Sequence, residues 1–163
     1  MKMVTLGKTG ITVPQNAFGA LPVQRISKEE AVYLLRKAYE GGMRYFDTAR
    51  AYSDSEEKVG EAFKDMRDKV YIATKTAATT PEDFWKDLET SLEKLQTDYI
   101  DVYQFHCVGQ CYKPGDGTGM YECMLEAKKQ GKIRHIGVTA HKIGIAYECV
   151  ESGLYETMQF PFS

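Results

Sequence analysis

The sequence predicts an α/β fold of the (β/α)8 TIM-barrel type, present only as its first half of about five strands behind an N-terminal β-hairpin. Short runs rich in β-branched and aromatic residues alternate with longer segments of helical periodicity, which is typical of βαβ units in a parallel sheet. Polar residues close several of these runs. Because barrel enzymes form their active sites at the carboxyl ends of the strands, the two patterns together predict a barrel with an active site.

The composition is that of a single globular unit. The chain has 163 residues, of which 43% are hydrophobic and 27% charged, and its formal net charge is −2. No linker of biased composition divides it, so residues 1–163 are expected to form one partial barrel domain. A complete barrel of this type has about 250 residues, and we therefore interpret the chain as truncated.

The first elements are a hairpin and a capped helix. Met3–Leu6 and Ile11–Val13 are strand-like runs around the turn-forming stretch Gly7–Gly10, and Phe18–Leu21 is expected to be a loop. Ser27–Glu30 has the form of a capping box, and an apolar stripe follows it at helical spacing. A pair of glycines then ends the helix.

From residue 44 onwards, strands and helices alternate. Thr80–Asp83 is the clearest helix start, because a cap residue, a proline in the first turn and early acids all favour one. Gly115–Gly119 lacks the G-x-G-x-x-G spacing of a dinucleotide fingerprint, and we expect it to be a flexible loop over the active site. The expected strands are 44–47, 70–75, 99–106, 134–139 and 156–160, and the expected helices are 55–64, one opening at 80, 121–130 and 143–151.

A barrel that stops after its fifth strand leaves its first and last strands unpaired. Unpaired strand edges are templates for pairing with other chains. Inward-facing side chains such as Ile72, Ile100 and Val102 would also lack a facing layer. We therefore expect either a homodimer, with the strands ending at Asp47 and near Phe160 at or close to the contact, or a missing C-terminal half that completes the barrel.

Charge and hydropathy argue against two classes of partner. The small net charge gives no general attraction to nucleic acid or to an anionic membrane. No apolar run approaches the roughly 20 residues of a membrane-spanning helix. The stretch Met1–Gly7 lacks the long apolar run of a secretory signal. We expect a cytoplasmic protein whose cysteines are free thiols.

Four polar residues of different chemistry gather at the ends of three expected strands. Asp47, Lys75 and His106 each close a strand, and Tyr52 follows the first of them by one short loop. In a barrel these positions meet at one edge of the sheet. A carboxylate, an ammonium, a phenol and an imidazole form a proton-donating site for a carbonyl group, because an adjacent ammonium favours ionisation of a phenol.

In this order, the residues resemble the aldo-keto reductase family. The similar stretches are Gly42–Tyr52, Ser55–Ala62, Ala73–Lys75, Asp98–His106 and Gly131–Val138. The resemblance implies NAD(P)H-dependent reduction of a small aldehyde or ketone, with Asp47, Tyr52, Lys75 and His106 as catalytic residues and Tyr52 as the proton donor. The loop Cys107–Met120 and the ending Gln159–Ser163 resemble the branch whose longer members carry iron–sulfur ligands near their carboxyl end, a segment that this sequence lacks.

The resemblance also implies a cofactor, NADPH or alternatively NADH. Thr139 and Gln159 would hold the nicotinamide carboxamide. The family commonly has Asn after the first of these, whereas this chain has Ala140, with His141 as a substitute one place on. The family's stacking aromatic and its basic loop for the adenosine phosphate come from later strands, so we expect weak or absent binding by the isolated chain. The implied cofactor-binding residues are Gly19, Asp47, Thr139 and Gln159.

Two other classes of function stay open. Asp47, His106 and His141 all lie at expected strand ends, and two histidines with one carboxylate can bind iron or zinc. Lys75 and Tyr52 would then have no role, and an ammonium beside a metal ion is unfavourable, so we expect no metal. Alternatively, a half-barrel could retain the family residues and only bind partners, without catalysis.

Overall fold

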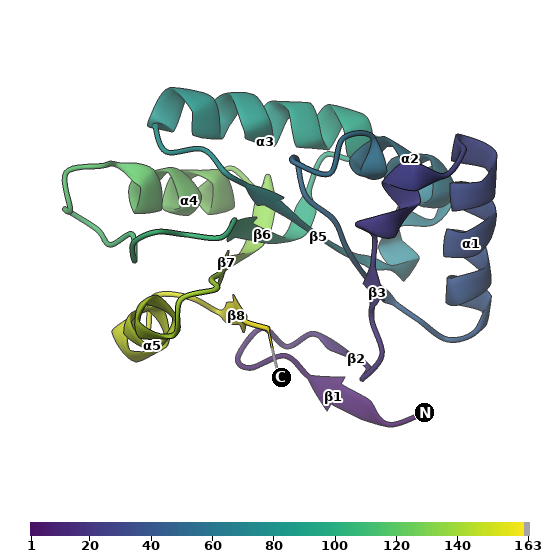
Figure 1. The fold of residues 1–163 in the computed structure, drawn as a ribbon, viewed down its shortest axis with the longest axis horizontal. Helices are drawn as coiled ribbons and strands as arrows, with labels where there is room; N and C mark the ends of the chain where they lie inside the picture. Colours follow the sequence, from purple (N-terminus) through teal and green to yellow (C-terminus); the bar gives the residue numbers. More distant parts are fainter. Residues whose placement is uncertain (162–163) are drawn as a thin grey trace.

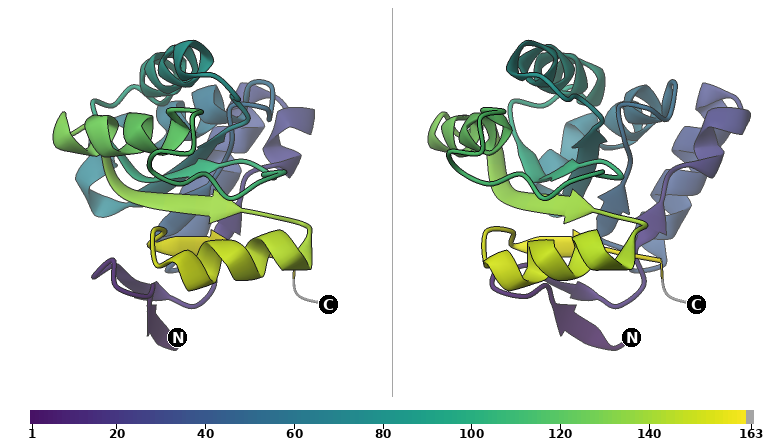
Figure 2. Two further views of the ribbon diagram at one scale, coloured as in Figure 1. Left: turned by 90° about the vertical axis from the view of Figure 1, so that its left-hand side faces the viewer. Right: turned by 60° about the vertical axis from the view of Figure 1, so that its left-hand side comes forward.

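A curled parallel sheet of six strands forms the centre of the structure, a computed structural model that describes residues 1–161. Each strand pairs with the next along the chain, and helices cover the outer face of the sheet (Figures 1 and 2). This is the arrangement of a partial (β/α)8 barrel. The strands are β3 (Phe18–Gly19), β4 (Tyr45–Asp47), β5 (Tyr71–Thr76), β6 (Ile100–Phe105), β7 (Ile133–Thr139) and β8 (Thr157–Gln159).

The sheet has one strand more than expected, because Phe18–Gly19 is strand β3 rather than loop. It pairs in parallel with β4, placing Gly19 opposite Asp47. A two-residue strand is too short to show the alternation by which strands are recognised. The strand ending at Asp47 is therefore an interior strand, and its predicted place at an open edge was wrong. The open edges are β3 and β8.

The N-terminal hairpin is confirmed, and it supplies a layer that the sequence analysis did not foresee. Strands β1 (Met3–Thr5) and β2 (Thr12–Pro14) pair antiparallel in a separate sheet. Ile11 and Val13 pack against Ala73 and Val102. Val102 is fully buried, as are Ile72 and Ile100 in the main core. The prediction that these three side chains lack a facing layer was thus wrong, and for Val102 the reason is its packing against the hairpin. Figure 1 shows this hairpin, β1 and β2, below the sheet.

The helices begin and end at the expected signals. Ser27 and Glu30 form both halves of a capping box at the start of α1, and the Thr80 side chain accepts from the Asp83 amide at the start of α3. The predicted apolar stripe of α1, which includes Ala31, Leu34 and Leu35, is only partly buried: Ala31 and Leu35 face the core, whereas Leu34 is 46% exposed. The helices are α1 (Lys28–Glu40), α2 (Ser55–Phe63), α3 (Pro81–Leu95), α4 (Met120–Lys129) and α5 (Ile143–Ser152), with 3-10 turns at Pro22–Arg25 and Lys64–Lys69.

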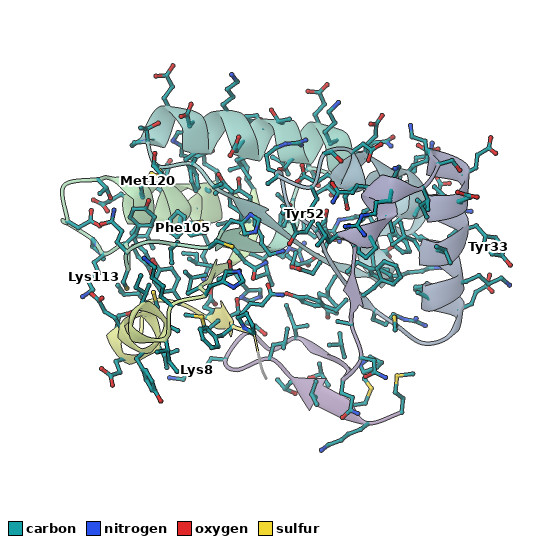
Figure 3. The ribbon with its side chains drawn as sticks, in the orientation of Figure 1. Lys8, Tyr33, Tyr52, Phe105, Lys113 and Met120 are labelled. Carbon is teal, nitrogen blue, oxygen red and sulfur yellow. The ribbon has the colours of Figure 1, made fainter. Side chains whose placement is uncertain are left out.

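The glycine-rich loop before α4 lies beside that helix and not over the active site. Asp116 accepts from the Thr118 amide and hydroxyl, and Glu122 of α4 accepts from the Gly115 amide. Lys113 pairs with Glu148 on α5 at 2.9 Å, far from Tyr52 in the view of Figure 3. The predicted position was wrong because contacts within the loop and to α4 and α5 hold it there. None of the helices in residues 1–161 is long and apolar enough to cross a membrane.

Candidate active site

Strand register brings the expected site residues to one edge of the inner face. Asp47 lies opposite Ala73, and Lys75 lies opposite Gln104 on β6. His106 follows the last residue of β6, and Tyr52 projects from the loop between β4 and α2 (Figure 3). The carboxyl ends of β4, β5 and β6 are therefore adjacent, and their side chains meet although they are up to about sixty residues apart in sequence.

A buried ion pair lies at the centre of this group. The Lys75 side chain is 3% exposed, and its Nζ donates to Asp47 Oδ2 at 2.6 Å and to the Thr48 carbonyl at 2.7 Å. The same Nζ lies 5.0 Å from the centre of the Tyr52 ring. Removing two charges from water is costly unless additional hydrogen bonds satisfy them, and the Thr48 carbonyl supplies one. The positive charge is thereby fixed next to the phenol.

His106 faces the same phenol from the neighbouring strand end. The two rings are 5.7 Å apart between centroids and meet edge to face, at 83°. Burial, followed by the nearby Lys75 ammonium, lowers the pKa of His106 below its usual value. The lowered pKa favours the neutral imidazole, which has one N–H that can donate to a carbonyl oxygen.

A cavity of about 220 Å³ opens in front of Tyr52, Lys75 and His106. Asp47 lies behind it and lines a second cavity of about 340 Å³, together with Gly19. Gln159 lines both cavities. The residues lining the first cavity are Tyr52, Lys75, His106, Cys107, Thr139, Ala140, His141, Gln159, Phe160 and Pro161.

Thr139 and Gln159 lie at adjacent strand ends, as their expected common role requires. They are register partners in β7 and β8, and the Ala140 amide donates to the Gln159 carbonyl at 3.1 Å. The Thr139 hydroxyl accepts from the Cys107 amide at 2.7 Å, which leaves its own hydrogen free to donate. Gly19 does not reach this cavity, because its strand lies on the far side of Asp47.

A buried carboxyl group ties the loop of Tyr52 to strand β5. Glu56 is fully buried, pairs with Arg50, and accepts from the Thr74 hydroxyl at 2.7 Å. Burial is the largest influence on this carboxyl and raises the pKa of Glu56. The Arg50 amide also donates to the Lys75 carbonyl at 3.0 Å. The segment that carries Tyr52 is thus fixed directly to the strand that carries Lys75.

Two further residues belong to this group and were not predicted from the sequence. Gln104 donates from Nε2 to Asp47 Oδ1 at 3.1 Å, and Cys107 lines the first cavity with a left-handed backbone, φ +50°. The alternation of a strand could have indicated Gln104, because residues two apart share a face and His106 follows it by two. The sequence marks Cys107 only by its position after His106 and four residues before Cys111.

The alternative metal site finds no support in the geometry. Among residues 1–161, no group of three His, Cys, Asp or Glu side chains is placed to hold a metal ion. Both oxygens of Asp47 are also hydrogen-bonded, one to Lys75 and the other to Gln104. A carboxylate engaged in this way by an ammonium is a poor metal ligand, because the two cations would compete for it.

Comparison with known proteins identifies the family. A sequence model of the Aldo/keto reductase family matches residues 15–160. Methylglyoxal reductase DkgA of Escherichia coli O157:H7 is 36% identical over 149 residues, covering 82% of this chain and 48% of that protein. The holo form of aldo-keto reductase AKR11C1 from Bacillus halodurans superposes with a TM-score of 0.89 at 28% identity, covering all of this chain and 58% of that one.

A second similar structure was solved with NADP bound. The aldo/keto reductase from Klebsiella pneumoniae in complex with NADP and acetate has a TM-score of 0.84 at 26% identity, covering 99% of this chain and 59% of that one. The chain spans about half the length of the curated relatives that it matches. On the match to the family model and the shared strand order, the chain belongs to the aldo-keto reductase family.

Proposed function

We propose that this chain provides the proton-donating part of an NADPH-dependent carbonyl reductase site, with an aldehyde or ketone as substrate. The observation that carries the proposal is the convergence on one cavity of Tyr52, His106 and a Lys75 ammonium held by Asp47. Three of these groups line the space where a carbonyl would bind, and the fourth fixes the charge from behind. A set of four, gathered from three strands, is hard to explain by packing alone.

The chemistry follows from where charge develops. When bound, a reduced nicotinamide would supply a hydride to the carbonyl carbon, and negative charge would develop on the carbonyl oxygen. Tyr52 donates a proton to that oxygen, and the Lys75 ammonium 5.0 Å from its ring stabilises the phenolate that remains. Asp47 keeps Lys75 charged and oriented at 2.6 Å. The neutral His106 donates a hydrogen bond that orients the carbonyl oxygen.

The cavity fits the nicotinamide end of such a cofactor better than its phosphate end. The Thr139 hydroxyl and the Gln159 side chain lie at adjacent strand ends and together offer donors and an acceptor for a carboxamide. Along the described walls of both cavities, Lys75 is the only lysine or arginine, and it is already paired. Charge-assisted contacts are worth about 1.5–3 kcal/mol each, so we propose weak or absent binding of NADPH, and of NADH, by the isolated chain.

We further propose that additional polypeptide, and not a second copy of this chain, closes the barrel. An eight-stranded barrel lacks two strands when six are present, whereas a second copy would bring six. Exposed apolar side chains lie on the helices that adjoin the edge strands in sequence, namely Tyr33 and Leu34 on α1, which follows β3, and Ile143, Tyr147 and Val150 on α5, which precedes β8. Light scattering tests this, since a discrete homodimer of the isolated chain would contradict it. A cytoplasmic location is likewise a proposal.

The test of the proposed chemistry is turnover in the intact chain and its variants. Oxidation of excess NADPH would be followed by absorbance with methylglyoxal and a series of small aldehydes. We expect Tyr52→Phe to lower turnover by about 10²–10⁴, the usual contribution of a general acid. Tyr147→Phe makes the same change at an exposed position on α5 and should have no effect. Equal turnover in the wild type and Tyr52→Phe would refute the role of Tyr52. A folded wild-type chain that binds NADPH but shows no turnover would favour the non-catalytic alternative.

A further inference from the structure

Gln104 occupies the middle of the inner face, between the strands that carry Lys75 and Thr139. It is the register partner of Lys75 on one side and of Gly137 on the other. Its side chain belongs to the few polar ones that are almost fully buried, with 3% exposure for the residue. A buried primary amide is unfavourable unless hydrogen bonds satisfy it, so its presence here calls for partners.

Those partners include the carboxylate of the candidate site. Gln104 Nε2 donates to Asp47 Oδ1 at 3.1 Å and lies 3.5 Å from the Thr74 carbonyl. Both partners are acceptors, which fixes the orientation of the amide, with its NH2 end towards Asp47. Lys75 takes the other carboxylate oxygen, Oδ2, at 2.6 Å. Two donors on two neighbouring strands therefore hold the two oxygens of one carboxylate, and together they oppose its rotation.

The neighbouring strand leaves room for this side chain. A Cβ atom at Gly137 would lie 2.9 Å from Gln104 Cγ and 2.2 Å from Thr157 Oγ1, distances that real Cβ contacts do not show. On the other side, Ala73 separates Asp47 from Val102 with only a methyl group. The small residues at these two positions allow the Gln104 side chain to extend across the sheet to Asp47.

We propose that Gln104 is a positioning residue, whose amide fixes the Asp47 carboxylate and through it holds the Lys75 ammonium beside Tyr52. The proposal rests on the proposed reductase function for its consequence, because it assigns Gln104 no contact with substrate. Its effect is to keep the ammonium in one place while charge develops on the substrate oxygen. Without the Gln104 amide, the Asp47 carboxylate keeps only Lys75 as a side-chain partner and can rotate. The Lys75 ammonium, which is hydrogen-bonded to this carboxylate, then shifts with it.

Two variants of the full chain test this, with one matched control. Gln104→Met keeps the volume of the side chain and removes its donor, and Gln104→Asn keeps the amide but is too short to reach Asp47. Gln130→Met makes the first change at the exposed end of α4. The first readout is hydrogen exchange of the Lys75 ammonium by nitrogen-detected NMR. The second is kcat and KM for carbonyl reduction, and thermal unfolding reports whether each variant folds.

We expect exchange at Lys75 Nζ to accelerate at least tenfold in both Gln104 variants, and kcat to fall about tenfold to a hundredfold with KM little changed. Gln130→Met should match the wild type in every measurement. Unchanged exchange in a folded Gln104 variant, or kcat within twofold of an active wild type, would overturn the proposal. If a wild-type chain that binds NADPH has no turnover, the proposed function fails, but the exchange measurement still decides whether Gln104 holds the pair. If Gln104→Met does not fold, Gln104→Asn carries the test.

Discussion

The two faces of the sheet differ in chemistry: the outer face packs apolar side chains, whereas the inner face carries the polar residues of the candidate site. On the outer face, aromatic rings pack under the helices, with Phe46 and Phe63 centred 4.4 Å apart and Phe84 and Tyr103 5.6 Å apart. On the inner face, polar side chains at the same strand ends hold one another by hydrogen bonds, as in the pair of Asp47 and Lys75. Because side chains alternate along a strand, one sequence specifies both, and each face can be changed while the other is kept.

Among changes to the inner face, Lys75→Met should have the largest effect. It removes the charge beside Tyr52, and turnover should fall by about 10²–10⁴, as for the loss of a general acid. It also leaves the Asp47 carboxylate buried without its cation, which costs about 3–5 kcal/mol of stability. Turnover and denaturant unfolding measure the two effects. Lys37→Met, which breaks an exposed pair with Glu40, is the control and should alter neither.

On the outer face, Phe46→Ala should destabilise the chain without a specific effect on the site. The ring is fully buried and contacts both Phe18 and Phe63. Truncation of a buried phenylalanine costs about 3–5 kcal/mol, and urea unfolding would show it as a lower midpoint with an unchanged slope. A loss below about 1 kcal/mol would contradict the burial of this face, since that is less than any cavity of this size costs.

The hairpin offers a smaller test, at the position where it supplies a layer to the inner face. Ile11→Val removes one methyl group from the contact with Ala73 and Val102. We expect a loss of about 0.5–1.5 kcal/mol, as for other buried Ile to Val changes. The same change at exposed Ile143 should have little effect. Equal stability of Ile11→Val and the wild type would mean that the hairpin does not stabilise the sheet.

The smallest expected effect is a pH dependence from His106. Its pKa is lowered in the folded chain by burial and by Lys75, so the unfolded chain, with a pKa near 6.5, takes up the proton first as the pH falls. The contribution of His106 to the free energy of unfolding is therefore fully present above about pH 6.5. It decreases as the pH falls from there towards the pKa of the folded state. Unfolding midpoints measured between about pH 7.5 and 5 should show this decrease. His106→Asn should reduce it, whereas His141→Asn, at an exposed position, should retain most of it.

Sequence reasoning succeeded where local signals agree. The hairpin, the capped helices and the alternation of strands were predictable, because each rests on residues close together in the chain. The meeting of Asp47, Tyr52, Lys75 and His106 was predictable as well, because strand ends share one edge in a barrel. The resemblance to a family added their expected roles, which the geometry accommodates and the experiments above are designed to test.

The failures have a common cause, namely that they depend on neighbours distant in sequence. Strand β3 has two residues and is defined by its pairing with β4. The burial of Val102 depends on a hairpin some ninety residues earlier in the chain. The role proposed for Gln104 depends on its hydrogen bond to Asp47 Oδ1 and on the space left at Gly137. Strand alternation places Gln104 on the same face as His106, but none of these three long-range contacts leaves a signal of its own in the sequence.

The hydrogen bonds between the loop of Tyr52 and strand β5 have a mechanical consequence. The Thr48 amide donates to Ala73 and the Arg50 amide to Lys75, while Glu56 accepts from Thr74. These hydrogen bonds join the loop of Tyr52 to strand β5, so the Tyr52 phenol and the Lys75 ammonium belong to one rigid unit. We expect local opening of the sheet to be greatest at β3 and β8, which have a neighbouring strand on one side only among residues 1–161. Such motion can widen or narrow the entrance to the cavity near Gln159 while the spacing between proton donor and charge stays constant.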